Sequence, residues 1–132
     1  MRALYSLTVM VFIIASCNSN SSKKQENNEN SPLVSSQEAL DLVQNHNYQL
    51  IDLRTPEETA EGSIEGALEI NFLSDDFQNE ISKLDKSGKY VLYCRSGGRS
   101  GKAWNLMNNM GFSEVKDATD GYSSLNEELN KQ

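Results

Sequence analysis

The stretch "KYVLYCRSGGRS", residues 89–100, combines a strand-like run with a glycine-rich turn. Residues 89–94 are the most apolar of the strand-like runs, which is typical of a strand in the centre of a parallel sheet. Cys94 ends this run, and the next six residues contain two arginines, two glycines and two serines. A helical pattern begins directly after them. The stretch therefore predicts a buried strand, a tight loop and a helix, with a cysteine at the junction.

Strand-like and helix-like segments alternate on both sides of this stretch. Two helix starts carry the capping-box pattern, Ser35 with Glu38 and Thr55 with Glu58. We expect helices over 35–46, 55–62, 74–84, 99–110 and 122–131, and strands over 48–54, 67–72, 89–94 and 113–119. Alternation of this kind predicts an α/β fold with a small parallel sheet and helices on both faces. The length of 132 residues favours one domain, and there is no internal repeat.

The first residues, "MRALYSLTVMVFIIASC", have the pattern of an export signal. Arg2 precedes fourteen mostly apolar residues, too few to span a bilayer as a helix, which takes about 20. The end of this segment, "IASC" at 14–17, resembles the lipobox of bacterial lipoproteins. That resemblance implies that residues 1–16 are a signal peptide and that Cys17 becomes lipidated at the new N-terminus. We therefore expect a protein of the bacterial cell envelope, periplasmic or at the cell surface, anchored to a membrane by its lipid.

Residues 18–32 contain no aliphatic or aromatic side chain. Such a segment cannot bury enough apolar surface to fold, so we expect 17–32 to be a lipidated cysteine with a disordered tether and 33–132 to be the folded domain. Loss of residues 1–16, which carry Arg2 and no acid, changes the formal charge from −7 to −8. This acidity argues against nucleic acid as a partner, and it leaves the lipid as the membrane contact.

Cys94 and Cys17 are the only cysteines of the chain. If Cys17 carries lipid, Cys94 has no partner for an intramolecular disulfide and is the only free thiol of the mature protein. A cysteine-based zinc site is disfavoured because His46 is the only histidine. We therefore expect no metal and no cofactor. Two hypotheses remain for Cys94, a reactive thiol or a small buried side chain of the core.

The residues that follow Cys94 favour the reactive thiol. Gly97 and Gly98 let the backbone turn successive N–H groups inward, which forms an anion-binding nest. The helix start adds unpaired N–H groups, and Arg95 and Arg99 add two positive charges. These groups should lower the pKa of the Cys94 thiol. Because no histidine is close in sequence, this lowered pKa would activate the nucleophile in place of a general base.

Four stretches together resemble the single-domain rhodaneses, a family of thiosulfate and persulfide sulfurtransferases. They are "CRSGGRS" at 94–100, "LIDLRTPEE" at 50–58, "EGSIEGALEINF" at 61–72 and "GFSEVKDATDGYSSL" at 111–125. The resemblance implies a rhodanese-like fold over 33–132 in which Cys94 is the catalytic nucleophile and carries a persulfide. It also implies a substrate-binding loop formed by Arg95, Ser96, Gly97, Gly98, Arg99 and Ser100. Asp52 and Arg54 match the supporting pair of the family, for which we expect a structural role.

The chain departs from the family pattern outside the cysteine loop, where we expect effects on packing and access more than on the chemistry. The residues concerned are Ser63, Glu65, Glu69, Asp120 and Leu125. Loop length separates the rhodaneses from cysteine phosphatases of similar fold, which place an arginine six positions after the cysteine. Here Arg99 is five positions after Cys94 and Ser100 occupies the sixth position. The shorter loop favours a persulfide sulfur over phosphate.

The sequence therefore predicts an exported, lipid-anchored sulfurtransferase that acts as a monomer. A Cys94 persulfide would carry sulfur from thiosulfate or another small donor, or from a persulfide, to a thiol or cyanide acceptor. The alternative hypothesis is a membrane-tethered module of the same fold that binds a partner or senses sulfide without significant turnover.

Overall fold

The computed structural model describes residues 32–132. The predictions for residues 1–31, namely the signal peptide, lipidation of Cys17 and most of the tether, lie outside the described residues. The strands are β1 (Leu33–Val34), β2 (Gln49–Asp52), β3 (Leu68–Glu69), β4 (Lys89–Tyr93) and β5 (Glu114–Ala118). The helices are α1 (Ser36–Asn45), α2 (Pro56–Ala60), α3 (Phe77–Ser82), α4 (Gly98–Asn109) and α5 (Gly121–Leu129).

The five strands form one parallel sheet with the order β1-β5-β4-β2-β3. The predicted central strand is confirmed, because β4 lies between β5 and β2 and pairs Leu92 with Ile51 and with Asp117. Its last four residues, 90–93, are all buried. A strand that is covered on both faces is expected to be apolar throughout, which explains the composition of this run.

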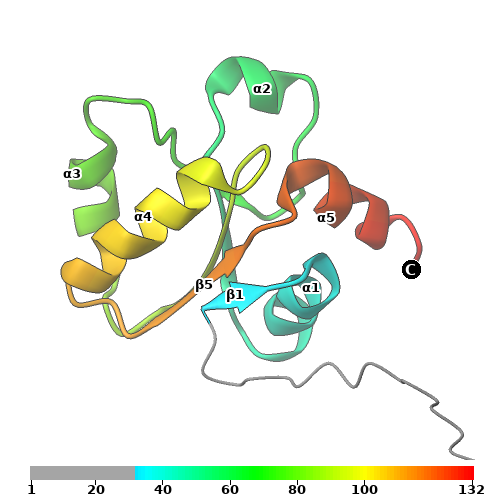
Figure 1. Ribbon diagram of the computed structural model, residues 1–132, viewed down its shortest axis with the longest axis horizontal. Coiled ribbons are helices and arrows are strands. Elements are labelled where there is room, and N and C mark those ends of the chain that lie inside the picture. Colours follow the sequence, from blue (N-terminus) through cyan, green and yellow to red (C-terminus); the bar gives the residue numbers. More distant parts are fainter. Residues whose placement is uncertain (1–31) are drawn as a thin grey trace, which may run out of the picture.

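Helices cover both faces of the sheet, and each face has its own apolar core (Figure 1). On one face, α3 and α4 contribute Phe77, Ile81 and Met107 to a core with alternate residues of β2 and β4. On the other face, α1 and α5 contribute Ala39, Leu40 and Leu125, which pack against Leu50, Val91 and Tyr93. The prediction of a parallel sheet with helices on both faces is thus confirmed.

Both predicted capping boxes are present, and they fix where α1 and α2 begin. The Ser35 and Thr55 side chains accept the backbone N–H of Glu38 and Glu58, whose carboxylates accept the N–H groups of the two caps. Other boundaries differ from the prediction. The strand predicted over 67–72 pairs only at Leu68–Glu69, and β1 was not predicted. A strand of two residues that pairs at the sheet edge leaves no hydrophobic period in the sequence.

Candidate active site

Cys94 lies directly after β4, at the carboxyl edge of the sheet, where parallel α/β folds bind their ligands. Its side chain is 1% exposed. The backbone N–H of Gly97 donates a hydrogen bond to the cysteine sulfur at 3.1 Å. Gly97 has φ +92°, and a Cβ there would lie 2.6 Å from the carbonyl oxygen of Thr119. The loop therefore needs glycine at position 97 to bring this N–H group to the sulfur.

Hydrogen bonds determine the acidity of the Cys94 thiol. Burial acts to raise its pKa, but hydrogen bonds from the backbone and hydroxyl of Ser100 and from the backbone of Ser96 and Gly97 outweigh burial. The pKa of the thiol is therefore lowered below its ordinary value. The Ser100 hydroxyl oxygen lies 3.7 Å from the sulfur. This lowering agrees with the sequence prediction, and its main source is the N–H groups of the loop and the start of α4.

The side chains of the loop have different environments. Arg95 is exposed and Ser96 and Gly98 lie at the surface, whereas Ser100 is fully buried beside the sulfur. Arg99 is partly buried, and attraction to Cys94 is among the causes that raise the pKa of its guanidinium. The structure thus brings all seven predicted loop residues together, and Arg99 stabilises negative charge on the sulfur.

A carboxylate that the sequence analysis did not assign to the site holds the two arginines. Glu58 accepts hydrogen bonds from Nη1 and Nη2 of Arg99 at 2.6 and 2.8 Å. Arg95 lies farther away, with its Nη1 3.8 Å from Glu58. The hydrogen bond from Arg99 is the main reason why the pKa of Glu58 falls from 4.5 to about 2. The arginine charges beside the sulfur are therefore partly neutralised, which the sequence prediction did not include.

The short helix α2 places Glu58 at this position. Its carboxylate accepts the backbone N–H of Thr55 at 2.9 Å, as the third helical residue of a capping box does. The same oxygen, Oε2, accepts the hydrogen bond from Arg99. The sequence identified the capping box, but no local pattern shows a contact between residues 41 positions apart.

Asp52 and Arg54 form the buried ion pair that the family resemblance implied, and its geometry is that of a structural support. Arg54 donates to both carboxylate oxygens of Asp52, with the shortest contact 2.7 Å, and Tyr93 donates to the same carboxylate at 2.6 Å. The guanidinium also donates to the backbone carbonyls of Glu58 and Gly62. The pair therefore fixes the backbone of α2 and the turn after it, and through them the position of Glu58.

The turn after β5 closes the site from the other side. Tyr122 donates its backbone N–H to the Cys94 carbonyl at 2.9 Å, and its ring lies 3.7 Å from the Arg54 guanidinium carbon. At Gly121, with φ +80°, a Cβ would collide with the Arg95 carbonyl. The glycine at 121 thus allows the turn to pack directly on the backbone of the cysteine loop.

The departures from the family pattern fall into two groups. Asp120 accepts hydrogen bonds from the backbone N–H and the hydroxyl of Ser36 at 3.0 and 3.2 Å, so it ties the turn to the start of α1. Leu125 is fully buried in the core beneath α5. The other three departures are exposed: Ser63 and Glu65 lie on the connection from α2 to β3, and Glu69 lies on β3. None of the five is among the residues that hydrogen-bond to the Cys94 sulfur.

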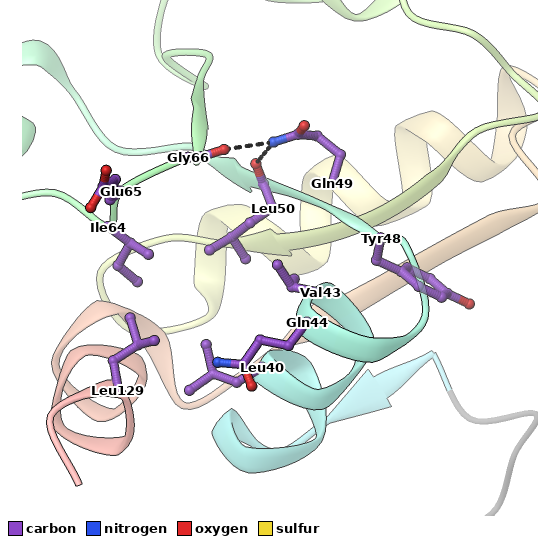
Figure 2. A pocket seen from close by; sticks show the side chains of 10 residues that line it. All are labelled: Leu40, Val43, Gln44, Tyr48, Gln49, Leu50, Ile64, Glu65, Gly66 and Leu129. Carbon is purple, nitrogen blue, oxygen red and sulfur yellow. Dashed lines mark hydrogen bonds between the residues drawn. The ribbon is translucent and has the colours of Figure 1, made fainter. Parts of the chain in front are cut away.

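A cavity of about 240 Å³ lies apart from the cysteine loop, between α1, the end of α5 and the 64–66 turn (Figure 2). Leu40, Val43, Leu50, Ile64 and Leu129 form its apolar lining. At one end, the Gln49 amide donates to the carbonyls of Leu50 and Gly66. No residue of the 94–100 loop lines this cavity, so it is not the place where a sulfur donor would meet Cys94.

Within residues 32–132, no group of three or more histidine, cysteine, aspartate or glutamate side chains is arranged to hold a metal ion. In the same part of the chain, the helices are too short or too polar to cross a bilayer.

Comparison with known proteins agrees with the geometry of this site. A family model described as the rhodanese-like domain matches residues 35–128. The chain belongs to this family. It is 34% identical over 93 residues to the chloroplastic thiosulfate sulfurtransferase 16 of Arabidopsis thaliana, covering 63% of this chain and 76% of that protein. It is 41% identical over 66 residues to a putative sulfurtransferase of Bacillus subtilis, covering 50% of this chain and 62% of the relative.

The rhodanese fold is also evident in solved structures. The human single-domain sulfurtransferase superposes with a TM-score of 0.61 at 27% identity, over 77% of this chain and 98% of the human protein. The comparison covers the five-stranded parallel sheet and its flanking helices, so the predicted rhodanese-like fold is confirmed.

Proposed function

We propose that this rhodanese is a sulfurtransferase that carries sulfane sulfur as a persulfide on Cys94. The observation that carries the proposal is the environment of the sulfur, which is buried at the carboxyl edge of the sheet among N–H and O–H donors that lower the pKa of the thiol. A thiolate held in this way is a nucleophile that needs no general base. Relatives named as thiosulfate sulfurtransferases support the choice of thiosulfate-type donors.

The proposed reaction has two displacements at sulfur. The Cys94 thiolate attacks the outer sulfur of thiosulfate, a new S–S bond forms, and the old S–S bond breaks with its electron pair leaving on sulfite. An acceptor thiolate or cyanide then attacks the outer sulfur of the persulfide. This step forms a new persulfide or thiocyanate and returns Cys94 as a thiolate. A persulfide donor reacts in the same way, with a thiolate as the leaving group.

The hydrogen-bond donors of the cysteine loop can stabilise the anions of both steps, the thiolate and the persulfide. The N–H group of Gly97 and the groups of Ser100 already point at the sulfur, so they can stabilise a thiolate before attack and the negative charge of a persulfide after it. Arg99, beside them, attracts an anionic donor, and Glu58 limits that attraction because it neutralises part of the arginine charge. We therefore expect a smaller preference for an anionic donor over an uncharged persulfide than two unpaired arginines would give.

Steady-state assays of the full-length protein test the activity. Thiosulfate with cyanide should yield equal amounts of sulfite and thiocyanate, and Cys94→Ser should abolish both products. Cys17→Ser serves as the matched control, because it removes the other cysteine and leaves the loop intact. Turnover that persists in Cys94→Ser, or its absence in the wild type with every thiosulfate and persulfide donor, would refute the proposal.

The sequence alternative, a binding or sensing module without significant turnover, is supported by the exposed altered residues on β3 and on the connection before it. It predicts that Cys94→Ser leaves the cellular function intact, whereas charge reversal at Glu65 and Glu69 abolishes it. The sulfurtransferase predicts the reverse. We prefer the enzyme because the cysteine loop retains every donor to the sulfur.

We also propose that the protein is exported and anchored to a membrane through a lipid on Cys17. The support is the sequence of residues 1–17, with an apolar segment that ends in "IASC". Cys17→Ala should release the protein from the membrane fraction and remove the added acyl mass from the N-terminus. A wild-type protein that keeps Met1 and partitions into the aqueous phase would contradict the anchor.

A further inference from the structure

Asp117 is a buried acid directly behind the cysteine loop. It lies on β5, is 2% exposed and faces α4, where its Oδ2 would lie 3.5 Å from a Cβ at Gly101. Its Oδ1 is buried and has no hydrogen-bond partner, which is true of no other buried side-chain oxygen or nitrogen among residues 32–132. A buried polar atom without a partner is costly, and the cost is much greater for a charged carboxylate than for a neutral acid.

The side chain of Ser100 joins this acid to the catalytic sulfur. Ser100 is fully buried and is hydrogen-bonded to Asp117. Its hydroxyl donates a hydrogen bond to the carbonyl of Gly97 at 3.1 Å, and the hydroxyl oxygen lies 3.7 Å from the Cys94 sulfur. A hydroxyl has only one proton to donate. Three neighbours can accept that proton: the Gly97 carbonyl, the Cys94 sulfur and, when it is ionised, Asp117. A neutral Asp117 can donate its own proton to Ser100 and then does not compete for the Ser100 proton.

The surroundings of Asp117 favour the neutral acid. Burial raises the pKa of its carboxyl above the ordinary value, and the hydrogen bond with Ser100, which acts to lower the pKa, only partly offsets burial. Of the charged side chains on α4, Arg99 binds Glu58 and Lys102 is exposed. Lys116 precedes Asp117 on the strand, so its side chain points to the opposite face. Cys94 is the remaining titratable group nearby, and a thiolate there disfavours a second negative charge.

We propose that Asp117 is a positioning residue that donates a hydrogen bond to Ser100, so that it does not take the Ser100 proton, which the Gly97 carbonyl and the Cys94 sulfur then share. In this arrangement the neutral carboxyl stabilises the thiolate through Ser100 without contacting the substrate. An ionised Asp117 would destabilise the Cys94 thiolate, because it would accept the Ser100 proton and its negative charge would repel that of the sulfur. The inference rests on the proposed function only in that Cys94 is the nucleophile.

The pH dependence of alkylation measures the thiol pKa and tests the direction of this chain of hydrogen bonds. All variants are made in the full chain with Cys17→Ser, so that iodoacetamide reports on Cys94 alone. We expect Ser100→Ala to raise the thiol pKa by about half a unit to one unit, with a threefold to tenfold slower reaction below the pKa. Asp117→Ala should raise it by a similar amount, and the double variant should not exceed Ser100→Ala.

Asp117→Asn separates positioning from charge, because the amide keeps a donor for Ser100. The thiol pKa should then stay within a few tenths of the wild-type value. A fall in the thiol pKa would show that Asp117 is ionised in the wild type and would overturn the inference. Additive effects of Asp117→Ala and Ser100→Ala would overturn it as well. Asp75→Asn, which changes an exposed acid, is the matched control.

A second measurement remains decisive if Asp117→Ala does not fold. The ¹³C chemical shift of the Asp117 carboxyl, assigned by comparison with Asp117→Asn, should report a protonated acid at pH 7. An ionised carboxyl would refute the inference. Neither measurement depends on sulfur transfer. A wild-type protein that accepts no sulfur would refute the proposed function and leave the inference about Asp117 intact, because that inference is tested by the pKa of the thiol and the protonation state of the carboxyl.

Discussion

Glu58→Gln is the substitution that most directly tests how the arginines of the loop are held. Glu58 binds both terminal nitrogens of Arg99, at 2.6 and 2.8 Å, and also accepts the N–H group of Thr55. Glutamine is close in shape and keeps an oxygen that can accept the Thr55 N–H group. The variant therefore removes the charge of the pair and largely preserves the capping box.

The pKa of Glu58 sets the size of the expected effect. The fall from 4.5 to about 2 corresponds to about 3 kcal/mol at about 1.4 kcal/mol per pKa unit. Solvent reaches this pair at the rim of the site and screens it, so we expect a smaller loss of about 1 to 2 kcal/mol in the free energy of unfolding at pH 7. The lowered pKa of Glu58 means that its pairing stabilises the fold more as the pH rises. Between about pH 2 and pH 4.5 the folded protein binds fewer protons at Glu58 than the unfolded chain does.

Urea unfolding of wild type and variant from pH 7 to pH 2 measures this contribution. The difference in stability should be complete above about pH 4.5 and should shrink as the pH falls toward about 2, where Glu58 is protonated. Glu61→Gln, at the end of the same helix and exposed, is the control. The reasoning is wrong if Glu58→Gln and Glu61→Gln are equally stable at pH 7, or if the difference in their stability does not change with pH.

Two further pairs of substitutions test how the loop and the closing turn are built. Gly97→Ala should lower the free energy of unfolding, measured by thermal unfolding, by about 1 to 3 kcal/mol, because residue 97 has φ +92° and its Cβ would lie 2.6 Å from the Thr119 carbonyl oxygen. At Gly98 a Cβ would meet no atom within 4 Å, so Gly98→Ala should change the stability by less than about 0.5 kcal/mol. Equal effects would contradict the proposed geometry. Asp120→Ala should lower the free energy of unfolding by about 1 kcal/mol, because it removes the hydrogen bonds from Ser36. Asp120→Asn should lose less stability, because the amide oxygen can still accept a hydrogen bond. An unchanged melting temperature in Asp120→Ala would show that the contact contributes nothing.

Local sequence signals predicted the elements that position the site. The capping boxes at Ser35 and Thr55 gave the starts of two helices because every group they need lies within four residues. The apolar run before Cys94 gave the central strand, since burial on both faces removes polar residues from such a strand. These signals placed the cysteine loop at the carboxyl edge of the sheet, as the structure has it.

Contacts between distant segments could not be predicted in the same way. Glu58 meets Arg99 from another helix, and Asp117 meets Ser100 from a neighbouring strand. Each of these acids has an ordinary local explanation, one as part of a helix cap and the other as a polar residue in a strand. The order of the strands brings both acids to the cysteine loop, and a local sequence pattern does not predict strand order. Knowledge of the family supplied the buried pair of Asp52 with Arg54 for the same reason.

Intact-mass analysis of the protein after brief exposure to thiosulfate or a persulfide tests the central claim most directly. The account predicts that the wild type and Cys17→Ser gain the mass of one sulfur atom, that peptide mapping places it on Cys94, and that cyanide removes it as thiocyanate. Cys94→Ser should gain nothing. A wild-type protein that gains no sulfur from any donor, or that gains it at a site other than Cys94, would contradict the account.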